Sequence, residues 1–90
     1  MEKELIRLLD AEGRIVHWPK KKAEKLLILK HLQAKLDTHR TYNEKEINAI
    51  INKWHLFHDH ALLRREMFDN YLISRTKDGG EYWVEGKRPL

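Results

Sequence analysis

The chain has 90 residues, of which 41% are hydrophobic and 36% charged, and its formal net charge is +4. This length allows one small domain over residues 1–90, and the composition is that of a folded globule rather than a disordered tail. Cysteine is absent, which excludes disulfides and thiolate metal sites. No apolar run approaches the roughly 20 residues of a membrane span, and the acidic N-terminus differs from a signal peptide. We therefore expect a cytoplasmic protein without membrane contact.

The positive charge is concentrated in one segment. Residues 14–35 carry seven basic side chains against Glu24 alone, whereas residues 36–90 carry nine of each sign. A local cluster of this kind favours a surface that faces a polyanion. The alternative is that the lysines only solubilise a helix, and the sequence leaves both readings open.

The N-terminal segment predicts a short helix, a turn and a short strand. Apolar residues at positions 5, 6, 8 and 9 predict a helix over Glu4–Leu9, and Gly13 supplies the turn that follows. The β-branched and aromatic run Arg14–Trp18 predicts a short N-terminal strand. Pro19 ends this strand because it lacks a ladder donor, and it suits the first position of a helix.

A second helix is predicted from Pro19 to Leu36. Leucines at positions 26, 29, 32 and 36 share one face and apolar residues at 23, 27 and 34 another, so we expect it in the middle of the domain. Its first turns carry Lys20, Lys21, Lys22 and Lys25. Free N–H groups, the helix dipole and these ammonium groups together favour a phosphate. We therefore predict that this end binds nucleic acid or another anion.

A third helix begins after a capping signal. Thr41 and Asn43 are each followed three residues later by a glutamate, so either can form a capping box. Isoleucines at 47, 50 and 51 and Trp54 then follow at helical spacing, which predicts one apolar stripe facing the core.

A fourth helix is predicted from Asp59, which can cap it, to Leu72. Arg64 falls inside the apolar arc, so we interpret it as a structural residue paired with Glu46 or Asp59. Arg65 is presented to solvent and is the candidate for contact with nucleic acid.

A β-hairpin is predicted at the C-terminal end. Asp78-Gly79-Gly80 separates the β-prone runs Ile73–Lys77 and Glu81–Glu85, and Asp-Gly in this setting favours a type I′ turn. Tyr82 and Val84 should share one face of the second strand. Helix, helix and hairpin in this order are typical of a winged helix. The predicted fold class is α+β and winged-helix-like, with three to four helices, a C-terminal two-stranded hairpin and a short N-terminal strand.

Several motifs together resemble one bacterial family. They are Gly13-Arg14, Trp18-Pro19, Tyr42-Asn43-Glu44-Lys45-Glu46-Ile47-Asn48, Asp59, Leu63-Arg64-Arg65-Glu66, Tyr71-Leu72, Arg75 and Gly79-Gly80-Glu81-Tyr82-Trp83. Over about residues 10 to 84 the chain looks like the family catalogued as domain of unknown function 2087. Members occur alone or fused behind helix-turn-helix regulators, which implies a role in transcription, and the family has no assigned catalytic residues to carry over. Glu85 departs from its pattern, because members often place a basic residue near the end of the wing.

The first functional hypothesis is a DNA-binding winged helix. The helix from Asp59 to Leu72 would enter the major groove, Arg65 would contact bases or phosphates, and the four lysines would anchor the backbone. Glu66 and Asp69 oppose this hypothesis, because carboxylates beside Arg65 repel phosphate.

The second hypothesis is a protein-interaction or dimerisation module on the same scaffold, without DNA contact. Its partner would be a transcriptional regulator or a second copy of the chain. The charges of residues 36–90 are balanced, which favours such an interface. Leu62 is expected to be exposed, and Phe68 or Trp83 is a further candidate for an exposed anchor.

Catalysis is not expected, and neither is a metal or another cofactor. His55, His58 and His60 lie near Asp59, but their spacing matches neither the histidine pair of a metalloprotease nor a closed Cys/His site. Such imidazoles more often cap, pack or hydrogen-bond, and His58 or His60 could sense pH by titrating near about 6.5. The sequence shows no Ser-His-Asp order, phosphate-cradling glycine loop or paired-carboxylate motif.

Overall fold

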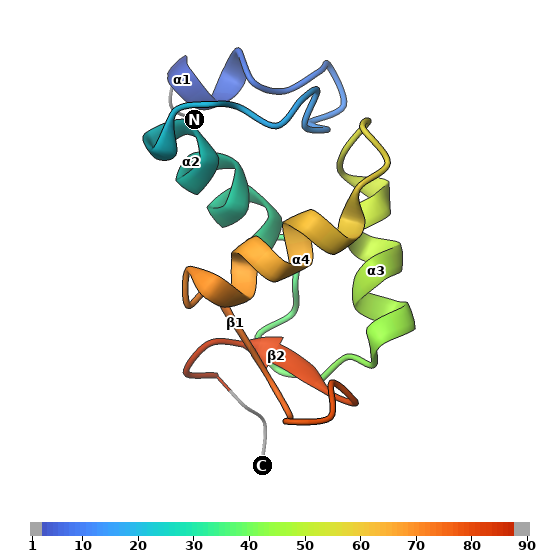
Figure 1. Ribbon diagram of the computed structural model, residues 1–90. Helices are drawn as coiled ribbons and strands as arrows, with labels where there is room; N and C mark the ends of the chain where they lie inside the picture. The colour runs from blue at the N-terminus through green and yellow to red at the C-terminus, as the bar shows by residue number, and fades with distance from the viewer. Residues whose placement is uncertain (1–2, 88–90) are drawn as a thin grey trace.

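The computed structural model describes residues 3–87, which form four helices and one two-stranded antiparallel sheet (Figure 1). The elements in chain order are α1 (Lys3–Ile6), α2 (Lys22–Gln33), α3 (Glu44–Lys53), α4 (His60–Asp69), β1 (Ile73–Arg75) and β2 (Tyr82–Val84). The predicted α+β class is therefore confirmed, and so is the C-terminal hairpin. No helix within these residues is long and apolar enough to span a bilayer.

The core lies where α2, α3 and α4 meet and is closed at one end by the hairpin. Figure 1 shows α4 crossing between α2 and α3, with the N-terminal segment at the end opposite the hairpin. The buried hydrophobic side chains of the core are Leu8, Ile15, Ile28, Leu29, Leu32, Leu36, Tyr42, Ile47, Ile51, Leu63, Met67, Leu72, Ile73, Tyr82 and Val84. These side chains come from residues 8–84 and form a single core.

The predicted N-terminal strand is reduced to one residue. Ile15 forms isolated bridges to Leu9 and to His55, but the strand does not extend to either side. The reason is that the neighbouring backbone is engaged in a turn: the N–H of Arg14 donates to the carboxylate of Asp10 over 2.8 Å. Gly13, in this turn, has φ = 82°, as its predicted role requires. The preceding helix, α1, is also shorter than predicted.

Helix α2 begins three residues later than predicted. Pro19 is buried ahead of the helix, and Lys21 is the N-cap residue, with no hydrogen bond from its side chain. The expectation of two buried faces is wrong as well, since the side chains at positions 23 and 34 are exposed and Leu26 is 37% exposed. Helix α2 packs mainly against α1 and α4, and its side chains at positions 23, 26, 30 and 34 face solvent.

Helix α3 has the predicted capping box, with Asn43 rather than Thr41 as the N-cap residue. The side chain of Asn43 accepts from the N–H of Glu46 over 2.8 Å, and the carboxylate of Glu46 accepts from the N–H of Asn43 over 2.9 Å. The predicted stripe also forms: Ile47 and Ile51 are buried, and the other two members are partly buried against the core.

Helix α4 is capped by Asp59, as predicted, and ends at Asp69. The N–H of Leu72 donates to the carbonyl of Met67 over 2.9 Å, which is the bond of a Schellman motif. Tyr71 occupies the left-handed position of this motif with φ = 60° and is 79% exposed. Tyr71 therefore lies outside the helical period, because α4 ends before it.

The hairpin pairs Ile73 with Val84 and Arg75 with Tyr82. Its connection is longer than the predicted type I′ turn, which would need positive φ at two successive residues. Only Gly79 in the connection has positive φ, at 74°. Tyr82 and Val84 are buried on one face, as predicted. Tyr82 also exchanges two backbone hydrogen bonds with Tyr42, of 2.7 and 2.8 Å, so the segment before α3 lies against β2.

Candidate functional site

The lysines predicted to bind an anion gather at the start of α2. Three of them are exposed and the fourth is half-buried; they are Lys20, Lys21, Lys22 and Lys25. The Nζ atom of the half-buried lysine lies 5.3 Å from the centre of the Trp18 ring. The carboxylate within this segment, Glu24, forms an ion pair with Arg7. None of the four lysines forms an ion pair with a residue that the structure describes, so their charge is not neutralised locally.

A groove of about 300 Å³ lies between two of these lysines, Lys22 and Lys25, and α4. It is lined by Lys22, Lys25, Leu26, Leu29, Glu66 and Asn70. The start of α2 therefore lies beside the solvent-facing side of α4, although more than 40 residues separate the two segments in sequence. Glu66 is the carboxylate in this groove. We refer to this surface as the lysine groove.

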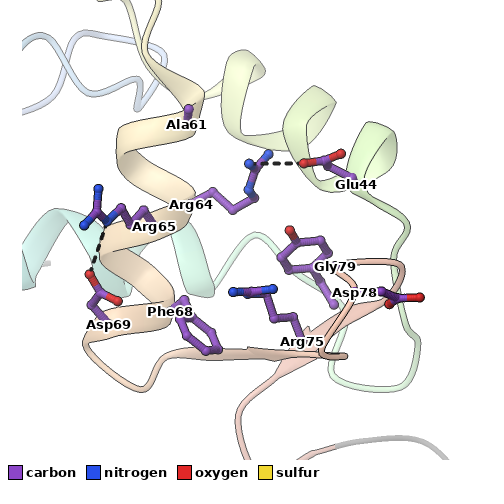
Figure 2. Close-up of a pocket in the computed structure, with 10 residues that line it drawn as sticks. Glu44, Ala61, Arg64, Arg65, Phe68, Asp69, Arg75, Asp78 and Gly79 are labelled. Atoms are coloured by element: carbon purple, nitrogen blue, oxygen red, sulfur yellow. Dashed lines mark ion pairs between the residues drawn. The ribbon is translucent and has the colours of Figure 1, made fainter.

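Arg65 precedes Glu66 on α4, and its side chain is 82% exposed. Its Nε atom is 3.7 Å from the carboxylate of Asp69, one turn further along (Figure 2). An exposed ion pair of this length contributes little free energy, so the guanidinium can exchange this partner for another anion. Arg65 is thus presented to solvent as expected, but beside a carboxylate.

Arg64 pairs with Glu44 rather than with the predicted Glu46 or Asp59. Its Nη2 atom lies 3.2 Å from the carboxylate of Glu44, and its Nη1 atom donates to the side chain of Asn48. Positions 44 and 48 share one face of α3, and that face is turned toward α4. The two predicted partners have other roles, since Glu46 binds Arg40 over 2.8 Å and Asp59 caps α4.

A second groove, of about 510 Å³, lies between α4 and the hairpin (Figure 2). It is lined by Glu44, Ala61, Arg64, Arg65, Phe68, Asp69, Arg75, Asp78, Gly79 and Tyr82. We call it the hairpin groove. Sequence reasoning did not bring these residues together, because they come from α3, α4, both strands and the connection between the strands.

Arg75 is the functional candidate that sequence reasoning missed. Its Cζ atom lies 4.8 Å from the centre of the Phe68 ring, and its Nη1 atom makes one long contact, of 3.5 Å, with the carbonyl of Thr76. Arg75 forms no ion pair with any carboxylate of residues 3–87, in contrast to Arg64 and Arg65. Strand alternation could have identified it, because residues two apart in a strand lie on the same face. Arg75 therefore shares the face of the buried Ile73, at the open end of the strand.

Asp78 lines the same groove but is engaged in the turn. The hydroxyl of Thr76 donates to its carboxylate over 2.7 Å and the N–H of Gly80 over 2.9 Å. These two hydrogen bonds, the hydroxyl first, hold the pKa of Asp78 below its ordinary value. In Figure 2 its carboxylate points away from Arg75.

Of the histidines near Asp59, His55 has a structural role. His55 is 5% exposed; its Nδ1 atom donates to the carbonyl of Ile51 over 2.7 Å, and its Nε2 atom accepts from the N–H of Asp59 over 2.9 Å. This side chain thereby joins the end of α3 to the cap of α4. No group of three or more potential ligands in residues 3–87 is arranged to hold a metal ion.

Comparison with known proteins places the chain in a family without placing it near a characterised protein. A family model described as "Uncharacterized protein conserved in bacteria (DUF2087)" matches residues 14–84, a range that includes both grooves. No curated protein and no solved structure matches the chain. The resemblance read from its motifs is confirmed, and the chain belongs to this bacterial family of uncharacterized proteins.

Proposed function

We propose that this protein is a nucleic-acid-binding, winged-helix-like domain of the bacterial cytoplasm that acts in transcription. In this proposal α4 is the helix presented to DNA, with Arg65 on its exposed face. The observation that carries the proposal is the lysine groove, where Lys22 and Lys25 lie beside that face without a carboxylate partner among the described residues. A presented helix flanked by cations from another element matches the way that backbone contacts position a recognition helix.

The carboxylates on α4 define how such binding would work. Glu66 lines the lysine groove and Asp69 pairs with Arg65, so each would repel a nearby phosphate. Affinity would then come mainly from the lysines at the start of α2, and it would depend strongly on salt. We expect contacts to the DNA backbone to dominate over base readout.

The experiment is a fluorescence anisotropy titration of a labelled random duplex at about 50 and 200 mM salt. A triple variant, Lys20→Ala, Lys21→Ala and Lys22→Ala, should reduce the slope of log K against log salt by up to about three units, because each lost phosphate contact removes about 0.9. The matched control replaces three exposed lysines elsewhere, Lys30, Lys45 and Lys53. Absence of binding by the wild-type protein at both salt concentrations, or equal losses in the two triple variants, would contradict the proposal.

A protein-interaction module is the second candidate, and the exposed aromatic residues at the end of α4 favour it. Phe68 and Tyr71 are 37% and 79% exposed and border a shallow depression beside β1. Exposed aromatic side chains are typical anchors of protein interfaces. A partner regulator or a second copy of the chain would cover them. Sedimentation velocity over a hundredfold concentration range, with Tyr71→Ser as the variant, tests self-association: a mass that rises with concentration only in the wild type supports it.

A further inference from the structure

The hydroxyl of Tyr82 is the first of three observations that identify a binding site in the hairpin groove. Tyr82 is only 4% exposed, yet it lines this groove, and its hydroxyl makes no hydrogen bond with a described residue. Within residues 3–87, every fully buried side-chain polar atom has a hydrogen-bond partner. Because the Tyr82 hydroxyl has none, it is not fully buried and opens onto the groove. A phenol whose ring is packed in the core and whose hydroxyl is free is a fixed donor.

The guanidinium of Arg75 is the second observation. It packs against the ring of Phe68 at 4.8 Å and has no carboxylate partner within the described residues. Stacking on an aromatic ring restricts the rotamers of the arginine, so less entropy is lost when its N–H groups bind an anion. Arg75 thus supplies a positioned positive charge that no described side chain neutralises.

The third observation is that Gly79 leaves open the space between these two donors. A Cβ atom at Gly79 would lie 3.6 Å from the hydroxyl oxygen of Tyr82 and 3.8 Å from Nη1 of Arg75. Both donors are therefore within 4 Å of one point. One phosphate group can accept a hydrogen bond from each of two donors that lie within 4 Å of the same point.

The remaining charged groups of the groove leave this position cationic. Arg64 lies beside it, with its Cζ atom 5.7 Å from the centre of the Tyr82 ring. The carboxylates of Glu44 and Asp69 are each paired with an arginine, and that of Asp78 is bound within the turn. The uncompensated charge is that of Arg75.

We propose that the hairpin groove binds one phosphate group, with Arg75 and Tyr82 as hydrogen-bond donors and Arg64 as the flanking cation. The groove, at about 510 Å³, is large enough for a group attached to the phosphate, such as a nucleoside. The phosphate can belong to a nucleic-acid backbone or to a free phosphorylated small molecule. The site is separate from the lysine groove, so it does not depend on the lysines that carry the proposed function.

Inorganic phosphate is the first probe, titrated into the ¹⁵N-labelled protein with the Gly79 amide and the Arg75 Nε–H signals followed by NMR. We expect saturable shifts of both signals with a Kd of the order of 1 mM. Arg75→Gln and Tyr82→Phe should each weaken binding about tenfold, because the first removes the positive charge and the second removes the hydroxyl donor. The control variant is Arg40→Gln, an exposed arginine outside the groove. Absence of saturable shifts, or equal weakening in the control, would overturn the proposal.

Two further titrations identify the source of the phosphate. Weaker binding of a random duplex by Arg75→Gln and Tyr82→Phe, with the salt-dependent lysine contribution unchanged, assigns the phosphate to the nucleic-acid backbone. Tighter binding of a mononucleotide than of phosphate, with duplex affinity equal in wild type and variants, assigns it to a small molecule. If the duplex does not bind at all but the phosphate shifts persist, the proposed DNA function fails while the phosphate site stands. In the opposite case the duplex binds, phosphate and the mononucleotide produce no shifts, and the two variants bind the duplex normally. The phosphate site then fails while the proposed DNA function stands.

Discussion

Leu72 donates its backbone N–H to the carbonyl of Met67 over 2.9 Å and so fixes Tyr71, which lies between them, at φ = 60°. This conformation disfavours a residue with a Cβ atom by about 1 to 2 kcal/mol. Glycine would remove the strain but would lose more backbone entropy on folding. We expect Tyr71→Gly to raise the free energy of unfolding by about 0.5 to 1 kcal/mol, measured by urea denaturation.

The control for this prediction is Tyr71→Ala, which keeps the strain and removes the ring, and it should not stabilise the protein. A loss of stability in Tyr71→Gly would show instead that contacts of the tyrosine ring outweigh the strain of its backbone.

The capping box of α3 gives a prediction about stability. Asn43→Ala should lower the free energy of unfolding by about 1 kcal/mol, because it leaves an N–H group of the first turn without its acceptor. For a domain of this size, that loss corresponds to a decrease of about 4 to 8 °C in Tm. Thr41→Ala is the matched control, since Thr41 was the alternative cap and makes no such bond. Equal decreases in the two variants would contradict this assignment of the cap.

Glu46 makes the same motif sensitive to acid. The N–H of Asn43, and then the guanidinium of Arg40, hold the folded-state pKa of Glu46 below its ordinary value of 4.5. The unfolded chain therefore takes up the proton first, so the stabilisation is present above about pH 4.5 and is lost as the pH falls through the folded-state pKa. Glu46→Gln should flatten the dependence of stability on pH between about 5 and 3. An unchanged acid limb of the stability curve would contradict this.

His55 should be the histidine that matters for folding. His55→Ala leaves the N–H of Asp59 without its acceptor and opens a cavity at the junction of α3 and α4. We expect it to lower the free energy of unfolding by about 2 to 3 kcal/mol in chemical denaturation. The exposed His39, replaced by alanine, should have an effect within about 0.5 kcal/mol. Similar losses in the two variants would contradict a structural role for His55.

Replacing Glu66 should strengthen DNA binding, whereas replacing the lysines should weaken it. Because its carboxylate lies in the lysine groove, Glu66→Gln should strengthen duplex binding by about two- to fivefold at low salt, with a smaller gain at high salt. Glu12→Gln changes the net charge equally but lies in a different groove, beside Trp54, and should have little effect. A gain in both variants would indicate a response to net charge alone.

Gly79 allows the phosphate site to be filled without a change of charge. Gly79→Asn should be tolerated by the turn, because asparagine accepts positive φ better than other residues with a side chain. Its side chain would enter the space between Tyr82 and Arg75, so the variant should fold, as judged by circular dichroism, and lose phosphate binding. Gly86→Asn is the matched control, since φ there is 75° and nothing lies within 4 Å of the added atom. Retained phosphate binding in a folded Gly79→Asn variant would count against the site.

Features set by residues close in sequence were predictable. The cap of α3, the cap of α4 and the buried stripe of Ile47 and Ile51 each depend on neighbours within one or two helical turns, and each appears in the structure. The hairpin was predictable for the same reason, although its turn type was not. Thr76 provides a side-chain acceptor for the backbone N–H groups of Gly80 and Glu81, and this bonding competes with a simple two-residue turn.

Features set by packing between distant segments were not predictable. Arg64 was correctly placed inside the apolar arc of α4, but its partner depended on which face of α3 turns toward it. The hairpin groove needed the relative positions of α3, α4 and both strands. The start of α2 was misplaced because Pro19 suits the first turn of a helix and also suits the buried loop position that it occupies.

The backbone bonds between Tyr42 and Tyr82 close a ring of the chain that contains α3, α4 and most of the hairpin. Forming this ring brings together residues that are 40 positions apart, which requires loop closure over a long separation. The hairpin is therefore held in place by the segment that leads into α3 and does not project as an independent arm. Hydrogen exchange at the Tyr82 amide should accordingly be as slow as in the middle of α3, and a chain cut before Tyr82 would lose the closure that makes these elements one cooperative unit.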